Sequence, residues 1–106
     1  MLAEKAGIDP AAAVALLIDS AASSRMLEVR GPGMASGAYK TPLMKLDVFQ
    51  KDLDIIGDFA RRVGCVAPLF EACVPLYLAG RAEAMGGYDT GAVVAVLRQM
   101  AGLPNG

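Results

Sequence analysis

Apolar residues recur at three- and four-residue intervals along most of the chain, which is the spacing of amphipathic helices. The clearest example is an expected helix over residues 41–63, which begins at a Thr-Pro pair. Its apolar positions lie alternately three and four residues apart: Leu46, Phe49, Leu53, Ile56, Ala60 and Val63. No useful length of sequence alternates apolar and polar residues as a half-buried strand does. The pattern predicts an all-α fold, with five or six helices packed as an irregular bundle.

Residues that start and stop helices give approximate bounds for the other elements. Residues 2–6 have the pattern of a helix end that Gly7 terminates, and so short a helix is expected to continue upstream. Asp9 and Pro10 form an N-cap and a first helical residue. The Gly-Pro-Gly sequence at 31–33 is expected to end a short helix and begin a loop to residue 40. The other expected helices cover residues 10–22, 24–30, 68–85 with a kink at Pro75, and 90–101.

The composition indicates one small domain that buries part of its surface against a partner. The chain has 106 residues and a mass of 11.0 kDa, which is close to the commonest domain size. It is 55% hydrophobic and only 20% charged, which is very apolar for an isolated monomer. We therefore expect residues 1–106 to form a single helical domain whose apolar faces meet another domain or subunit.

Charge and motif content argue against several classes of function. The net charge of -1 and the absence of a basic run disfavour nucleic-acid binding. The longest apolar stretch, residues 11–18, is too short to cross a bilayer, and the first residues lack the features of a signal peptide. We expect a cytoplasmic protein with neither a nucleic-acid nor a membrane partner. Cys65 and Cys73 match no zinc pattern in a chain without histidine, and both are expected to be buried, reduced thiols.

No residue of this chain is a candidate for catalysis. Without histidine, the usual Ser-His and Cys-His nucleophile pairs are excluded. No Gly-x-Gly-x-x-Gly segment follows an expected strand, so the chain has no dinucleotide-binding loop. The Gly-Pro-Gly sequence at 31–33 lacks the preceding strand and the lysine of a phosphate-binding loop, which favours its role as a helix stop.

Lys51 is the one candidate for binding a cofactor. At about 100° per residue, it projects opposite the apolar face of the expected 41–63 helix. In one interpretation it pairs with Asp47 on a solvated face, for about 0.3–0.5 kcal/mol. In the other, its ammonium contacts a polar group of a cofactor held by a neighbouring domain. Val48 and Ile55 lie near the same face, and apolar side chains beside charges are typical of an interface rim, which favours a partner domain.

Five segments in order resemble the C-terminal domain of 3-hydroxyisobutyrate dehydrogenases, within the β-hydroxyacid and 6-phosphogluconate dehydrogenase-like enzymes. They are residues 4–10 (EKAGIDP), 24–32 (SRMLEVRGP), 49–53 (FQKDL), 67–69 (APL) and 89–93 (DTGAV). Together they span almost the whole chain. Pro75 has no counterpart in the family pattern.

The resemblance implies a two-domain enzyme of which this chain is one part. An N-terminal Rossmann domain, with the start of the interdomain helix, would bind NAD or NADP, and the helical domain would close the active site and build a homodimer. Hydride would pass between the nicotinamide and a small hydroxy acid. The family's Lys-Asp-Leu lysine contacts the cofactor, and Lys51 occupies that position. The family's general acid/base lysine would lie upstream of Met1, so the chain alone is expected to bind no cofactor and to be inactive.

Two other hypotheses remain open. The chain could be a stand-alone, non-catalytic module that retains the dimerising surface. It could also be an unrelated helical bundle, which a fold without the long central helix would reveal.

Overall fold

The computed structural model describes residues 1–104. Within them the chain forms six α-helices and one 3-10 turn: α1 (Leu2–Lys5), α2 (Pro10–Ile18), α3 (Arg25–Ser36), α4 (Leu46–Arg62), α5 (Pro68–Ala82), η1 (Thr90–Ala92) and α6 (Val93–Met100). The described residues contain no strand, only an isolated bridge between Lys45 and Asp89. The predicted all-α class is confirmed. None of the described helices is both long and apolar enough to cross a membrane.

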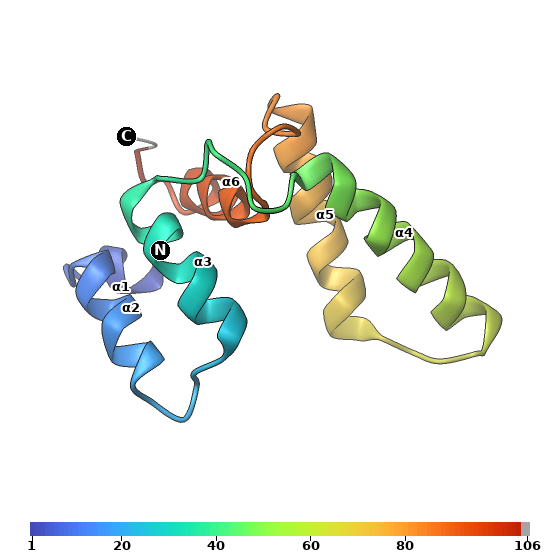
Figure 1. Cartoon of the computed structure of the whole chain (residues 1–106), viewed down its shortest axis with the longest axis horizontal. Helices are drawn as coiled ribbons and strands as arrows, with labels where there is room; N and C mark the ends of the chain where they lie inside the picture. The colour runs from blue at the N-terminus through green and yellow to red at the C-terminus, as the bar shows by residue number, and fades with distance from the viewer. Residues whose placement is uncertain (105–106) are drawn as a thin grey trace.

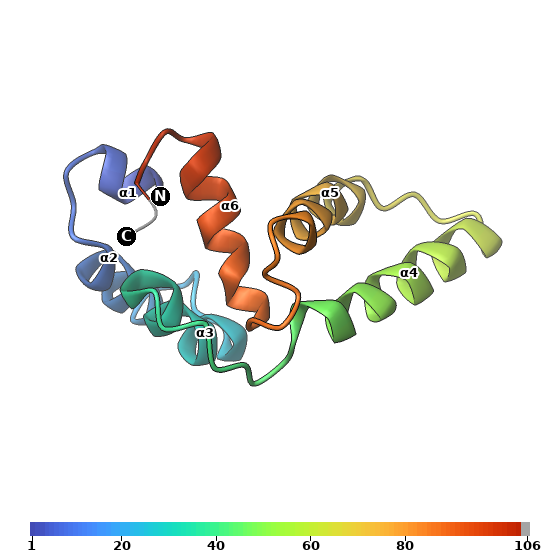
Figure 2. The same cartoon turned by 90° about the horizontal axis from the view of Figure 1, so that it is seen from above.

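The helices form two arms on either side of α6 (Figure 1). One arm holds α1 to α3, and the other is the long hairpin of α4 and α5. Seen from above, the two arms diverge from α6 (Figure 2). The radius of gyration is 14.6 Å, whereas a compact domain of this length has about 13 Å. The chain is thus more open than a self-contained domain.

The core is small and is centred on α6 and the turn before it. Its buried cluster consists of Met85, Ala92, Ala95 and Val96. Leu46, at the start of α4, is the one large side chain of the described residues that is fully buried. Arg98 of α6 pairs with Glu4, which holds α1 against α6.

Only the first half of the apolar stripe on α4 is covered. Leu46 and Leu53 are buried, as the periodicity predicts. Ile56 and Val63, however, are 48% and 55% exposed. The reason is visible in Figure 1, because the far end of the α4–α5 hairpin extends beyond α6 and packs only within itself. The apolar positions therefore do lie on one face of α4, as predicted. In the second half of the helix, however, that face is not buried in the core.

The expected helix stop at 31–33 is wrong, because α3 continues through Pro32 to Ser36. Pro32 costs one backbone hydrogen bond, but its carbonyl accepts a bond from the Ser36 hydroxyl at 2.9 Å. Gly31 is buried and allows α2 to approach closely. The helix ends instead at Gly37, which has the left-handed φ of 78° that glycine adopts without strain.

Other boundaries also differ from the sequence expectations. Helix α2 ends at Ile18 rather than near residue 22, and the Ser20 hydroxyl donates to the Leu17 carbonyl at 2.7 Å just beyond that end. Helix α5 runs unbroken through Pro75 to Ala82. It stops before residue 85 because Ala84 has a positive φ of 63°, which no helix accommodates.

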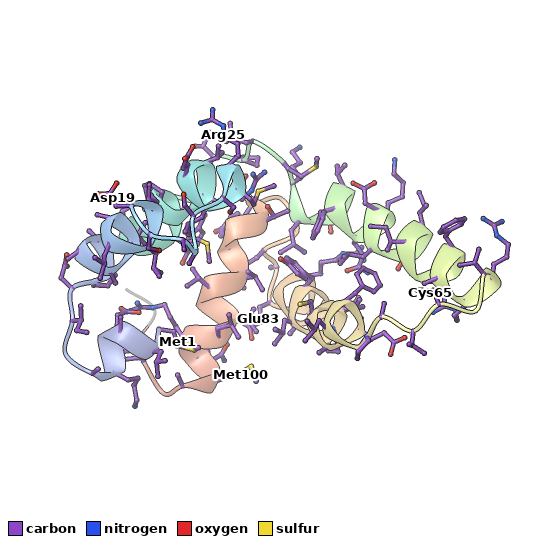
Figure 3. The ribbon with its side chains drawn as sticks, turned by 90° about the horizontal axis from the view of Figure 1, so that it is seen from below. Met1, Asp19, Arg25, Cys65, Glu83 and Met100 are labelled. Carbon is purple, nitrogen blue, oxygen red and sulfur yellow. The ribbon has the colours of Figure 1, made fainter. Side chains whose placement is uncertain are left out.

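The expected burial of the two cysteines is wrong, since Cys65 and Cys73 are both exposed. Figure 3 shows Cys65 at the far end of the α4–α5 hairpin, remote from α6. Free cysteine is usually buried, but this end of the hairpin has no third element to cover it.

The close approach of α2 and α3 predicts a contrast between two glycines of α3. A Cβ at Gly31 would lie 2.8 Å from Val14 Cγ1, whereas a Cβ at Gly33 would meet nothing closer than 3.4 Å. Gly31→Ala should lower the free energy of unfolding by about 1–2 kcal/mol through overpacking. Gly33→Ala, the matched control, should raise it by up to about 1 kcal/mol through helix propensity. Chemical denaturation measures both, and equal effects would contradict the packing explanation.

Candidate cofactor-contact site

Lys51 lies exposed in the first half of α4, on the face opposite Leu46 and Leu53. Val48 and Ile55, one turn before and one turn after it, are 46% and 59% exposed. The orientation that the helical periodicity predicts is therefore confirmed. The side chain stands between two exposed aliphatic residues, as at an interface rim.

The predicted ion pair between Asp47 and Lys51 does not form. Asp47 instead accepts a hydrogen bond from Arg81 Nε of α5 at 2.7 Å. This pair bridges the two helices of the hairpin, so the carboxylate turns sideways toward α5. Within residues 1–104, Lys51 makes no salt bridge with any carboxylate. The solvated ion pair is thereby removed as an explanation of this lysine.

The position of α4 is fixed by a buried aspartate far away in sequence. Asp89 is only 7% exposed. Its Oδ2 accepts the backbone N–H groups of Leu43 and Met44 at 2.9 and 3.1 Å, and its Oδ1 accepts that of Gly91 at 2.9 Å. The carboxylate thus joins the segment before α4 to the turn before α6. Its bond to Gly91 also caps η1, the turn that precedes α6.

These hydrogen bonds of Asp89 explain why α4 begins at Leu46 instead of at residue 41, where the sequence predicted its start. The first N–H groups of a helix have no partner inside the helix. Here those of Leu46 and Asp47 donate to the carbonyls of Tyr88 and Gly86, at 2.9 and 3.0 Å. The preceding residues are held extended against Asp89 and cannot also be helical. Lys51 is consequently placed by contacts to residues 86–89.

Arg30 of α3 adds a charged partner to Asp89. We call Asp89, its backbone donors and Arg30 the anchor. The Arg30 Nε lies 3.3 Å from Asp89 Oδ1 and donates to the Thr90 hydroxyl at 2.8 Å. Burial raises the pKa of Asp89, but the three backbone N–H donors and Arg30 outweigh it, and the net pKa is below the ordinary value of 3.8. Sequence reasoning missed Arg30, because a partner sixty residues away leaves no local signal.

A pocket of about 430 Å³ lies beside this anchor, where α3, α4, α5 and η1 meet. Most of its lining is apolar and includes Met26, Met34 and Phe49. Tyr77 borders it and packs edge-on against Phe49, with ring centroids 5.1 Å apart. Burial is the main cause of the raised pKa of Tyr77. This largely apolar lining suits contact with an apolar group.

No group of three or more His, Cys, Asp or Glu residues in the part of the chain that the structure describes could hold a metal ion. The Lys51 ammonium can donate to a phosphate or ribose oxygen, and its aliphatic neighbours can exclude water around that bond. These residues fit contact with one side of a dinucleotide, and the complete cradle for its phosphates would have to come from elsewhere.

Comparison with known proteins assigns the chain to a family. Residues 1–97 match the family described as "NAD-binding of NADP-dependent 3-hydroxyisobutyrate dehydrogenase". The chain belongs to this family. The resemblance inferred from five short segments is thereby confirmed, and an unrelated bundle is excluded.

Two relatives and one solved structure give the extent of the similarity. The chain is 36% identical to L-threonate dehydrogenase of Cupriavidus necator over 85% of its length, and 33% identical to 2-hydroxy-3-oxopropionate reductase of Escherichia coli over 95%. The crystal structure of 3-hydroxyisobutyrate dehydrogenase from Salmonella typhimurium matches 90% of the chain, with a TM-score of 0.83 and 28% identity. The chain spans 30%, 34% and 33% of these proteins, about a third of each.

The anchor predicts that Asp89→Asn is strongly destabilising. The variant leaves Arg30 without its counter-charge and turns an amide N–H toward backbone donors, which should lower the free energy of unfolding by about 2–4 kcal/mol. Because the pKa of Asp89 is lowered by folding, its contribution is present above about pH 4 and is lost as the pH falls through the folded-state value. When the pH is lowered below 4, the free energy of unfolding of the variant should therefore fall less than that of the wild type. Asp19→Asn, at the exposed end of α2, is the control, and an equal effect of the two variants would exclude the anchor.

Proposed function

We propose that this chain is the C-terminal helical domain of a cytoplasmic, NAD(P)-dependent β-hydroxyacid dehydrogenase of the 3-hydroxyisobutyrate type. In this role it closes the active-site cleft over a Rossmann domain and contributes to a homodimer. The observation that carries the proposal is the ammonium of Lys51, which makes no salt bridge within residues 1–104 and lies exposed between Val48 and Ile55 in the family's Lys-Asp-Leu segment. A lysine without a salt bridge among residues 1–104 is available for an anionic ligand.

The amount of exposed surface supports a partner for this domain. The accessible surface is 6828 Å², whereas a folded monomer of 11.0 kDa exposes about 5,600 Å². The excess is roughly 1,200 Å², and a standard interface covers about 800 Å² per partner. Large apolar side chains are exposed on both arms, including Leu16 of α2 and Leu69 of α5. One or two interfaces would cover the excess.

In this proposal the residues of the chain bind and orient, and do not react. The bound dinucleotide supplies the hydride exchanged with the hydroxyl-bearing carbon of a small hydroxy acid. Lys51 donates a charge-assisted hydrogen bond to the cofactor, and Val48 and Ile55 exclude water beside it. The general acid/base lysine would come from the segment before Met1, so the chain alone would be inactive and would bind no dinucleotide.

The alternative is a stand-alone, non-catalytic dimerisation module, which the same excess of exposed surface also supports. The two functions differ in what lies upstream of the Met1 codon. An in-frame Gly-x-Gly-x-x-Gly segment roughly two hundred residues earlier supports the dehydrogenase. Its absence from the coding sequence supports the module.

The proposal predicts that Lys51→Ala in the intact protein weakens dinucleotide binding and leaves the fold unchanged. Loss of a charge-assisted hydrogen bond of about 1.5–3 kcal/mol should raise the dissociation constant for NAD(P)H by roughly ten- to a hundredfold. Fluorescence titration of the cofactor measures this change. Lys5→Ala, which removes an exposed lysine of α1, should leave the constant unaltered. An unchanged dissociation constant for Lys51→Ala would mean that Lys51 lies on a solvated surface and does not contact the cofactor.

The 106-residue chain by itself is expected to self-associate, because its apolar surface is uncovered. Sedimentation should give an average mass above the monomer value of 11.0 kDa at high concentration. Replacing Leu16 and Leu69 together by Asp should lower that mass, since the two side chains are 72% and 84% exposed. A wild-type chain that sediments as a monomer at every concentration would count against the dimer.

A further inference from the structure

The outward face of α4 carries a continuous row of side chains, which we call the α4 ridge. At about 100° per residue its members fall within an arc of about 80°. Three of them are large apolar side chains about half exposed, and two are cations. The ridge consists of Val48, Lys51, Ile55, Phe59 and Arg62.

The carboxylates beside the ridge are bonded to donors of their own chain. Asp47 pairs with Arg81 of α5, and Asp58 pairs with Arg61. Asp54 Oδ1 accepts from Gln50 Nε2 at 3.2 Å. On the opposite flank, Asp52 lines the pocket between α3 and α5. The negative charges next to the ridge are therefore turned aside or partly satisfied.

The two cations of the ridge have no carboxylate partner within residues 1–104. Arg62 lies over the ring of Phe59, with its guanidinium carbon 5.5 Å from the ring centroid. This contact holds the guanidinium on the ridge without neutralising its charge. Arg62 and Lys51 are eleven residues apart on the same side of the helix, or about 16 Å. The ridge is thus apolar along its length, with an uncompensated positive charge in each half.

We propose that the α4 ridge is the surface on which the nucleotide-binding domain docks when the cleft closes, and that Arg62 pairs there with a carboxylate of that domain. This inference rests on the proposed function, and it assigns to Arg62 a contact separate from that of Lys51 with the cofactor. A surface that is apolar and acidic complements the ridge in both respects. A second copy of the ridge does not, because two cations would face two cations.

The test measures the accessibility of the ridge in the intact protein. In a background of Cys65→Ser and Cys73→Ser, both exposed positions, a cysteine is introduced by Ile55→Cys. Arg25→Cys, at the outward-facing start of α3 (Figure 3), is the control. The thiol at position 55 should react with a soluble disulfide reagent at least about tenfold more slowly than the thiol at position 25. Equal rates would show an open ridge and overturn the inference.

A charge reversal identifies what covers the ridge. Adding Arg62→Glu to the Ile55→Cys protein should restore most of the labelling rate, and Arg25→Glu in the same protein should not. Protection that disappears on dilution to monomers would instead mean that a second copy covers the ridge, which also overturns the inference.

Failure of this inference is distinguishable from failure of the proposed function. A thiol at position 55 that labels freely, in a protein whose NAD(P)H binding depends on Lys51, rejects the docking surface and the water-excluding role of Ile55, but not the dehydrogenase. Protection at position 55 without any NAD(P)H binding rejects the dehydrogenase and the identity of the docked domain, while the α4 ridge remains a covered surface.

Discussion

The carboxylate of Asp89 joins the two arms of this molecule, and the placement of α4 depends on it. A buried carboxylate is stable only where hydrogen bonds and an opposite charge replace its water. Asp89 obtains both, from three backbone N–H groups and from Arg30. Those donors come from α3, from the segment before α4 and from the turn before α6. One side chain thereby fixes the junction at which the α4–α5 hairpin leaves the rest of the chain.

The hairpin extends from this junction with little support beyond it. Leu46, at its start, is buried, but its far end exposes apolar side chains such as Val66 and Leu69. A self-contained domain would fold such a hairpin back onto its core, because apolar area in water is unfavourable. An open arm is physically reasonable where another domain fills the space beside it. The match to about a third of each relative is consistent with that view.

Local patterns predicted most of the helices, because caps and three-to-four spacing act over a few residues. Asp9 caps α2 as expected, and Ser24 caps α3 in the same way. What the sequence could not provide was long-range pairing. One of the two interpretations paired Asp47 with Lys51 inside α4, but Asp47 pairs instead with Arg81, thirty-four residues away, across the hairpin.

The same distinction applies to the candidate site. The outward direction of Lys51 follows from helical geometry and was predictable, whereas the absence of a salt bridge to it among the described residues was not. The burial of Cys65 and the end of α3 were wrongly predicted for a related reason. The burial of a thiol and the end of a helix both depend on which elements pack together. The general tendencies of free cysteine to be buried and of proline to break helices do not specify that packing.

A structure of the intact protein with NAD(P)H bound would test the account most directly. The account predicts the Lys51 ammonium within about 2.7–3.2 Å of a phosphate or ribose oxygen of the cofactor, at the closed interface between α4 and the nucleotide-binding domain. A structure in which the cofactor is bound and the cleft is closed, but Lys51 remains in solvent, would contradict it.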